Sequence, residues 1–250
     1  MSKPGFLYGY HPVLEALRSR PDEVQRLYVA SGARQNRLRD VFSLAERQGI
    51  AVVELAGHAM DDLVGRVAHQ GVAAEVKAFA YVELEAMLTL ASERGEAPLL
   101  VALDQIQDPG NLGAIIRSAF ALGAHGLFFP TSRAAEVTPT VVKASAGASN
   151  HLLIGRVVNL SRAINELKDA GVWSVGAVMG EGEPIERVDW TMPTLLVVGS
   201  EGHGLRRLVG ETCDRLAHIP MPGGLGSLNA SVAAAICLYE ANRQRRGSSS

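Results

Sequence analysis

The hydrophobic positions of this 250-residue chain form short apolar runs separated by stretches with apolar residues at helical spacing. In the first part of the chain the pattern predicts strands at 27–30, 50–55 and 72–76, and helices beginning near Pro12 and spanning 36–48 and 59–67. From residue 98 it predicts strands at 99–103, 126–129, 153–158, 172–178, 194–199 and 216–219. Helices are expected at 111–122, 139–147, 159–171 and 229–242, with Thr138 and Asn159 as N-caps.

The near-continuous apolar strands of the second part favour a parallel sheet that helices cover on both faces. The first part predicts a smaller α/β unit. We therefore expect an α/β protein with an N-terminal domain at 1–78, a linker with a short helix at 79–96, a larger domain at 97–246 and a disordered tail at 247–250. In a parallel sheet, ligands bind beyond the carboxyl ends of the strands.

The composition of the chain excludes several classes of protein to which it could belong. A hydrophobic content of 47% supports a packed core, and a net charge of -2 argues against a basic field over the whole molecule. Cys213 and Cys237 cannot form a disulfide framework, and neither they nor the histidines show metal-ligand spacing. The start of the chain lacks the apolar core of a signal peptide, and no run reaches transmembrane length. We expect a cytoplasmic protein that needs no metal.

Two glycine-rich segments, 198–205 and 219–229, each follow an apolar strand. Glycines at these places let main-chain groups approach a ligand closely. The spacing Gly199-x-x-Gly202-x-Gly204 differs from the dinucleotide fingerprint, and the chain has no phosphate-binding P-loop and no G-x-S-x-G elbow. The segments predict a pocket but do not define its ligand.

Polar residues near these strand ends each allow two interpretations. Asn111 and Arg117 are either a cap and a solvated arginine, or a site for an anion such as a phosphate, because Arg117 lies among apolar neighbours. Glu201 is either an ordinary loop carboxylate or a group that orients a substrate. Asn229 is an N-cap of the final helix, or a hydrogen-bonding group that acts together with Ser227.

Three ordered motifs resemble those of the SpoU (TrmH) family of RNA ribose methyltransferases. The first is Asp104-x-x-x-Asp108-Pro109-x-Asn111-x-Gly113-x-x-x-Arg117-x-Ala119, and the second is Val198-Gly199-x-Glu201-Gly202-x-Gly204-Leu205. The third is Ile219-Pro220-Met221 followed by Ser227-Leu228-Asn229-x-Ser231-Val232-Ala233. The opening segment Tyr8-Gly9-x-x-x-Val13-x-Glu15-Ala16-Leu17 resembles the substrate-binding domain of the family. The two-domain layout is most similar to members that methylate a guanosine of bacterial large-subunit (23S) ribosomal RNA.

The resemblance implies a catalytic domain with a C-terminal deep trefoil knot, S-adenosylmethionine as the cofactor and a homodimer. By motif match, the cofactor-binding residues are Gly199, Gly204, Ile219, Met221 and Leu228, and the catalytic residues are Asn111, Arg117, Glu201, Ser227 and Asn229. The residue that matches Arg117 is the family's proposed base. Because arginine side chains stay protonated in proteins, anchoring the phosphate beside the reacting ribose is the alternative role.

Contacts to RNA are expected from a local basic cluster, Arg34, Arg37 and Arg39, whose plain alternative is a solvated start of a helix. Arg243, Arg245 and Arg246 are expected to be solubilising charge. Two other functions stay open: the same chemistry on transfer RNA or another ribosomal site, and an RNA-binding homologue without catalysis.

Overall fold

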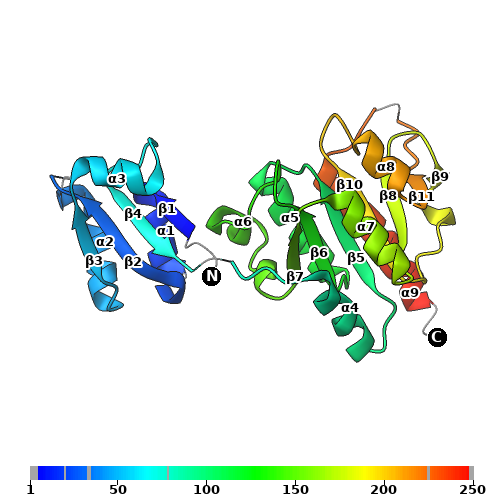
Figure 1. Ribbon diagram of the computed structural model, residues 1–250, viewed down its shortest axis with the longest axis horizontal. Helices are drawn as coiled ribbons and strands as arrows, with labels where there is room; N and C mark the ends of the chain where they lie inside the picture. The colour runs from blue at the N-terminus through cyan, green and yellow to red at the C-terminus, as the bar shows by residue number, and fades with distance from the viewer. Residues whose placement is uncertain (1–4, 20, 33–34, 78, 224–225, 248–250) are drawn as a thin grey trace. The chain divides into compact units, whose positions relative to one another are not determined.

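The computed structural model describes residues 5–247 except 20, 33–34, 78 and 224–225 (Figure 1). The chain divides into two compact units at the Phe79–Ala80 bond. Each unit has its own sheet and its own core.

The first unit is a small sheet packed against helices. Its strands lie in the order β1-β4-β2-β3, in which β4 is antiparallel to β1 and β2 while β3 is parallel to β2. The strands are β1 (Gly5–Tyr8), β2 (Val24–Ala30), β3 (Val52–Leu55) and β4 (Val72–Val76), and the α-helices are α1 (Tyr10–Ser19), α2 (Gln35–Arg47) and α3 (Gly57–Val64). A buried core joins α1 and α2 to the sheet through Val13, Leu17, Leu27 and Val41.

The second unit is built on a sheet whose strands lie in the order β7-β6-β5-β10-β8-β11-β9, and each of these neighbouring pairs is parallel. The strands are β5 (Leu99–Asp104), β6 (Gly126–Pro130), β7 (Leu153–Val157), β8 (Trp173–Val178), β9 (Glu183–Pro184), β10 (Thr194–Gly199) and β11 (Arg215–His218). The helices are α4 (Leu84–Glu93), α5 (Pro109–Ala121), α6 (Pro139–Ala144), α7 (Leu160–Asp169), α8 (Arg207–Thr212) and α9 (Ala230–Gly247).

Helices cover both faces of this sheet (Figure 1). Helices α4, α7 and α8 pack on one face, where Met87, Ile164 and Val209 meet Leu100, Phe128 and Val197 of the strands. On the other side, α5 packs against both α6 and α9, and α9 also contacts β10. The prediction of a parallel sheet with two covered faces is therefore confirmed.

The short helix predicted within the linker at 79–96 is present as α4, but it is part of the second unit. Leu84, Met87 and Ala91 face the core of that unit, while the glutamates face solvent. The final helix also continues beyond Asn242 to Gly247. Asn159 caps α7 as expected, whereas the side chain of Thr138 makes no capping hydrogen bond.

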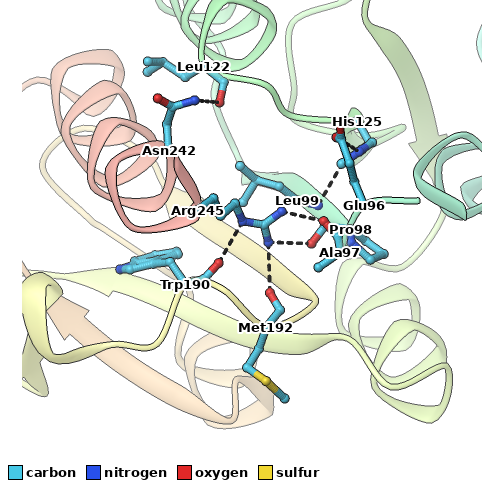
Figure 2. A network of polar contacts seen from close by, with 10 residues as sticks. All are labelled: Glu96, Ala97, Pro98, Leu99, Leu122, His125, Trp190, Met192, Asn242 and Arg245. Atoms are coloured by element: carbon cyan, nitrogen blue, oxygen red, sulfur yellow. Dashed lines mark hydrogen bonds and ion pairs between the residues drawn. The ribbon is translucent and has the colours of Figure 1, made fainter. Parts of the chain in front are cut away.

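The last turns of α9 are fastened to the base of the sheet, as Figure 2 shows. The Arg245 guanidinium donates to the carbonyls of Trp190 (2.8 Å), Pro98 (3.0 Å), Met192 (2.9 Å) and Ala97. Nearby, Asn242 donates to the carbonyl of Leu122 at 3.2 Å. The expectation that Arg245 is only solubilising charge is wrong, because its donors satisfy carbonyls of two loops far from it in sequence.

A buried histidine lies beside the same strand end (Figure 2). His125 Nδ1 accepts from the Leu99 amide at 3.0 Å, and its Nε2 lies 3.0 Å from Glu96 Oε2. Burial lowers the pKa of His125 below its ordinary value. At neutral pH the ring is therefore neutral, with its proton on Nε2 facing Glu96.

Candidate active site

The strand ends of the second unit bring distant segments together. Gly199, the last residue of β10, lies opposite Asp104, the last residue of β5. On its other side β10 pairs with β8, which in turn pairs with β11. Because these strands are parallel, the loops that follow them leave from one edge of the sheet. The two glycine-rich segments and the Asp104–Asn111 loop all begin at this edge.

An apolar cleft of about 610 Å³, its open mouth included, lies between the two glycine-rich segments, the end of β8 and α9. Every residue expected to bind the cofactor lines it: Gly199, Gly204, Ile219, Met221 and Leu228. Glu201 and Ser227 line it as well. Sequence reasoning missed other lining residues, which include Ala177, Val178 and Met179 at the end of β8, Ala217 of β11, and Ala233 and Cys237 of α9. The end of a predicted strand at Val178 was a usable signal for the first group.

The Ser200–Gly204 loop folds back on itself at the wall of this cleft. The Ser200 amide donates to the Gly204 carbonyl at 3.1 Å, and the Gly204 amide donates to the Ser200 carbonyl at 2.9 Å. A Cβ atom on Gly199 would collide with the Gly204 carbonyl, so position 199 accepts only glycine without a shift of the loop. Main-chain groups thus form this wall, and the glycines serve the fold of the loop itself.

A buried carboxylate closes the base of the same loop. Asp104 accepts from the Arg206 amide (2.8 Å) and from Arg206 Nε (2.7 Å), and its side chain is fully buried. Since Asp104 pairs with Gly199 in the sheet, it holds both ends of the Glu201 loop. Asp104 belongs to the first sequence motif, but no sequence pattern identified Arg206 as its partner, 102 residues away.

Three polar side chains from different segments meet at the rim of the cleft. Asn229 Nδ2 donates to Asn111 Oδ1 at 2.9 Å and to Glu201 Oε1. Asn229 Oδ1 accepts from the Ser231 amide (2.9 Å) and hydroxyl (2.6 Å). The Ser231 amide fixes the orientation of the carboxamide, because only the oxygen can accept its proton. Asn111 does not cap α5, since Asp108 Oδ2 accepts from the Asn111 amide at 2.7 Å.

A second, more polar cavity also borders the Glu201 loop. Ser200 and Glu201 line both cavities. The remaining lining residues come from the segment that joins β5 to α5 and from the loop itself: Gln105, Ile106, Gln107, Asp108, Asn111 and His203. Glu201 therefore borders both an apolar, glycine-walled space and a polar space.

Arg117 lies apart from this cluster. It lines neither cavity, and its side chain is exposed. Ile115, Ile116 and Ala119 face the core, whereas residue 117 falls on the opposite side of α5, so the apolar surroundings expected for it are absent. In the described part of the chain, the Arg117 side chain makes no hydrogen bond or ion pair.

Only part of the basic cluster Arg34, Arg37 and Arg39 in the first unit lies within the described residues. Arg34 and the side chain of Arg37 lie outside the described residues, and Arg39 is exposed on α2. The role of these three residues in binding RNA stays a prediction.

The two thiols are not arranged for covalent chemistry. Burial raises the pKa of Cys237 to about 12 and the pKa of Cys213 to about 12, so both stay protonated at neutral pH.

Within the described residues, no group of three histidine, cysteine, aspartate or glutamate side chains could hold a metal ion. Among the described helices, none has both the length and the hydropathy needed to span a membrane.

Residues 98–239 match the SpoU rRNA Methylase family, and residues 6–82 match the family described as RNA 2'-O ribose methyltransferase substrate binding. The chain therefore belongs to the SpoU family, and it is an RNA methyltransferase that depends on S-adenosylmethionine.

Among its relatives is the putative TrmH family tRNA/rRNA methyltransferase YacO of Bacillus subtilis, 42% identical over 96% of each chain. The 23S rRNA (guanosine-2'-O-)-methyltransferase RlmB of Coxiella burnetii is 41% identical over 98% of each chain. The solved structure of the SpoU methyltransferase AviRb from Streptomyces viridochromogenes in complex with AdoMet is 30% identical. It aligns with a TM-score of 0.64 over 98% of this chain and 91% of its own.

Proposed function

We propose that this protein methylates the ribose 2'-hydroxyl of a guanosine in large-subunit (23S) ribosomal RNA. The observation that carries the proposal is the meeting of Asn111, Glu201 and Asn229 between a glycine-walled apolar cleft and a polar cavity. The choice of RNA is supported by the similarity to a 23S rRNA guanosine methyltransferase over nearly the whole of both chains.

The apolar cleft fits S-adenosylmethionine in chemistry. Its walls combine aliphatic side chains with main chain exposed at Gly199 and Gly204, which suits an adenine ring and a methionine chain lying close to the backbone. We assign the binding of this cofactor to Gly199, Gly204, Ile219, Met221 and Leu228. When bound, the cofactor supplies an electrophilic methyl group on a sulfonium.

The residues at the rim would prepare the nucleophile. A ribose hydroxyl is a weak nucleophile until it is oriented and its proton is removed. The Glu201 carboxylate, held by Asn229, provides a hydrogen-bond acceptor between the two cavities. Asn111 and Ser227 would hold the ribose, and the exposed Arg117 guanidinium would anchor the adjacent phosphate, a role that planar arginine performs well.

The same proposal includes a homodimer and a cytoplasmic location, where ribosomal RNA is found. Helices α5 and α9 pack against each other, and they leave Phe120, Val232 and Tyr239 exposed on the surface. A second copy of the chain would cover these large apolar side chains. Light scattering of the purified protein should give twice the mass of the chain, and a monomer at micromolar concentration would exclude the dimer.

We also propose that the C-terminal segment forms the deep trefoil knot of the family. After β11, the chain returns through residues 219–229 to place α9 against α5 and β10, on the other half of the sheet. This return past the Glu201 loop supports a threaded path. A crystal structure with continuous density from β10 to α9 would test it by tracing whether the chain passes through that loop.

The substrate is tested by mapping 2'-O-methylation in RNA from cells with and without the protein. The expected result is loss of methylation at one guanosine of large-subunit RNA, restored by the intact gene. Unchanged large-subunit RNA together with a lost methyl group in transfer RNA would contradict the choice of substrate.

A further inference from the structure

Gln105 has a backbone conformation that residues other than glycine rarely adopt. It follows β5 directly and has a φ of 62°, in the left-handed region that glycine adopts without strain. The other described residues that are not glycine and have positive φ are Gln70, Arg133 and Ala146. Strained residues of this kind gather at functional sites.

Gln70 is the other described glutamine with a positive φ. Gln70 Oε1 accepts from the Tyr10 amide at 3.0 Å, so its carboxamide has a structural role in the first unit. Gln105 is half-buried and lines the polar cavity, and within the described residues its carboxamide makes no hydrogen bond. A half-buried carboxamide that faces a cavity can bind a ligand in that cavity.

The cavity has the chemistry of a pocket for a nucleobase. Beside Gln105 it is lined by Gln107, by His203 and by Asp108, whose carboxylate also caps α5 through the Asn111 amide. These groups offer both donors and acceptors, as the hydrogen-bonding edge of a base requires, and RNA-binding proteins read unstacked bases through such edges. Ser200 and Glu201 connect this cavity to the cofactor cleft.

We propose that the polar cavity lined by Gln105, Gln107 and Asp108 takes the base of the target nucleotide and that Gln105 reads its edge. This inference rests on the proposed function, because the ribose of the same nucleotide must reach Glu201. The strain at Gln105 is then the cost of presenting a carboxamide where glycine would fit the backbone better.

Two variants separate the side chain from the backbone. Gln105→Gly removes the carboxamide and relieves the strain, whereas Gln105→Ala removes the carboxamide and keeps a side chain at positive φ. Each is compared with the wild type in three measurements: the thermal midpoint of unfolding, the Kd for S-adenosylmethionine by calorimetry, and kcat/KM on an RNA fragment. The fragment carries the mapped target nucleotide, with guanosine or adenosine at that position.

Both variants should lose about tenfold of the preference for guanosine over adenosine, within the range of a specific base contact. Their Kd for the cofactor should stay within twofold of the wild type, and Gln105→Gly should unfold at no lower temperature. The base pocket is wrong if both variants keep the wild-type preference for guanosine. It is also wrong if their affinity for the cofactor falls as much as that preference does. Neither result would contradict the proposed function. If mapping identifies a different nucleotide or transfer RNA, the same comparison on that RNA tests the pocket after the proposed substrate has failed. A wild-type protein that methylates no RNA overturns both proposals.

Discussion

Asn229 makes two kinds of hydrogen bond through one carboxamide. Its oxygen accepts from the first turn of α9, as an N-cap does, while its nitrogen donates to Asn111 and Glu201. From the sequence these were alternatives, but the structure shows that one side chain satisfies both. The sequence can predict the cap because capping is local. The contacts to Glu201 and Asn111, which lie 28 and 118 positions away, depend on the fold of the sheet.

The two roles can be separated by Asn229→Asp. Aspartate caps a helix about as well as asparagine, so the free energy of unfolding should change by no more than about 1 kcal/mol. The variant loses the amide donor and places a second carboxylate beside Glu201, so kcat should fall by about 100-fold or more. Methyl-transfer assays and urea unfolding measure the two effects. Asn229→Ala is the control that loses both the cap and the donor; wild-type activity in the aspartate variant would contradict the role of Nδ2.

The proposed role of Arg117 as an anchor for the RNA phosphate can be tested by substitution. Because its side chain is exposed and lines neither cavity, Arg117→Ala should abolish methyl transfer yet leave the Kd for S-adenosylmethionine within a few fold. Calorimetry and a transfer assay with labelled cofactor check this. The exposed Arg133 offers a matched control, since Arg133→Ala should keep most of the activity. Lost cofactor binding in Arg117→Ala would contradict an anchor for the RNA phosphate.

At the scale of elements, the sequence predicts most strands and helices of the second unit, because its apolar runs are buried on both sides. Strand β10 has the predicted bounds, and β5 ends one residue later than predicted, at Asp104. Two parts could not be predicted. The apolar positions of α4 predict a helix but do not show which of the two cores it joins, and the Asp104–Arg206 pair joins segments that only the order of the strands brings together.

The attachment of α9 gives a prediction about stability. Arg245→Met keeps much of the apolar stem but removes the donors to four carbonyls, so it should lower the free energy of unfolding by about 2 kcal/mol. Both tryptophans, Trp173 and Trp190, lie in the second unit, so their fluorescence during urea unfolding reports on that unit. Arg246→Met is the matched control, because Arg246 is exposed, and it should change stability by less than about 0.5 kcal/mol. Equal effects of the two variants would argue against the carbonyl contacts.

At the scale of the whole molecule, the two units have separate cores and match two different families. The hydrophobic pattern predicted two units and the family resemblance agreed with them, but the pattern placed the start of the second unit at residue 97, after α4, whereas it begins at Ala80. The sequence does not show which surface of the first unit binds RNA. A cluster of arginines has the same sequence pattern whether it is solvated or binds phosphate.

The division predicts that a fragment of residues 80–250 retains the cofactor site. Its Kd for S-adenosylmethionine should lie within a few fold of that of the full chain, because every residue that lines the cleft belongs to the second unit. Methyl transfer to ribosomal RNA should fall at least tenfold, since the first unit matches a substrate-binding family. Full activity of the fragment would show that the first unit does not contribute to substrate binding.

Methyl transfer to a ribose hydroxyl can be measured by the position of a methyl label in the product RNA. Large-subunit RNA from cells that lack the protein is incubated with the purified enzyme and S-adenosylmethionine labelled in its methyl group. The RNA is then hydrolysed with alkali, which cannot cleave beside a 2'-O-methyl group. We expect the label in one alkali-resistant dinucleotide that contains 2'-O-methylguanosine. Label in single nucleotides, which would place the methyl group on a base, would contradict it.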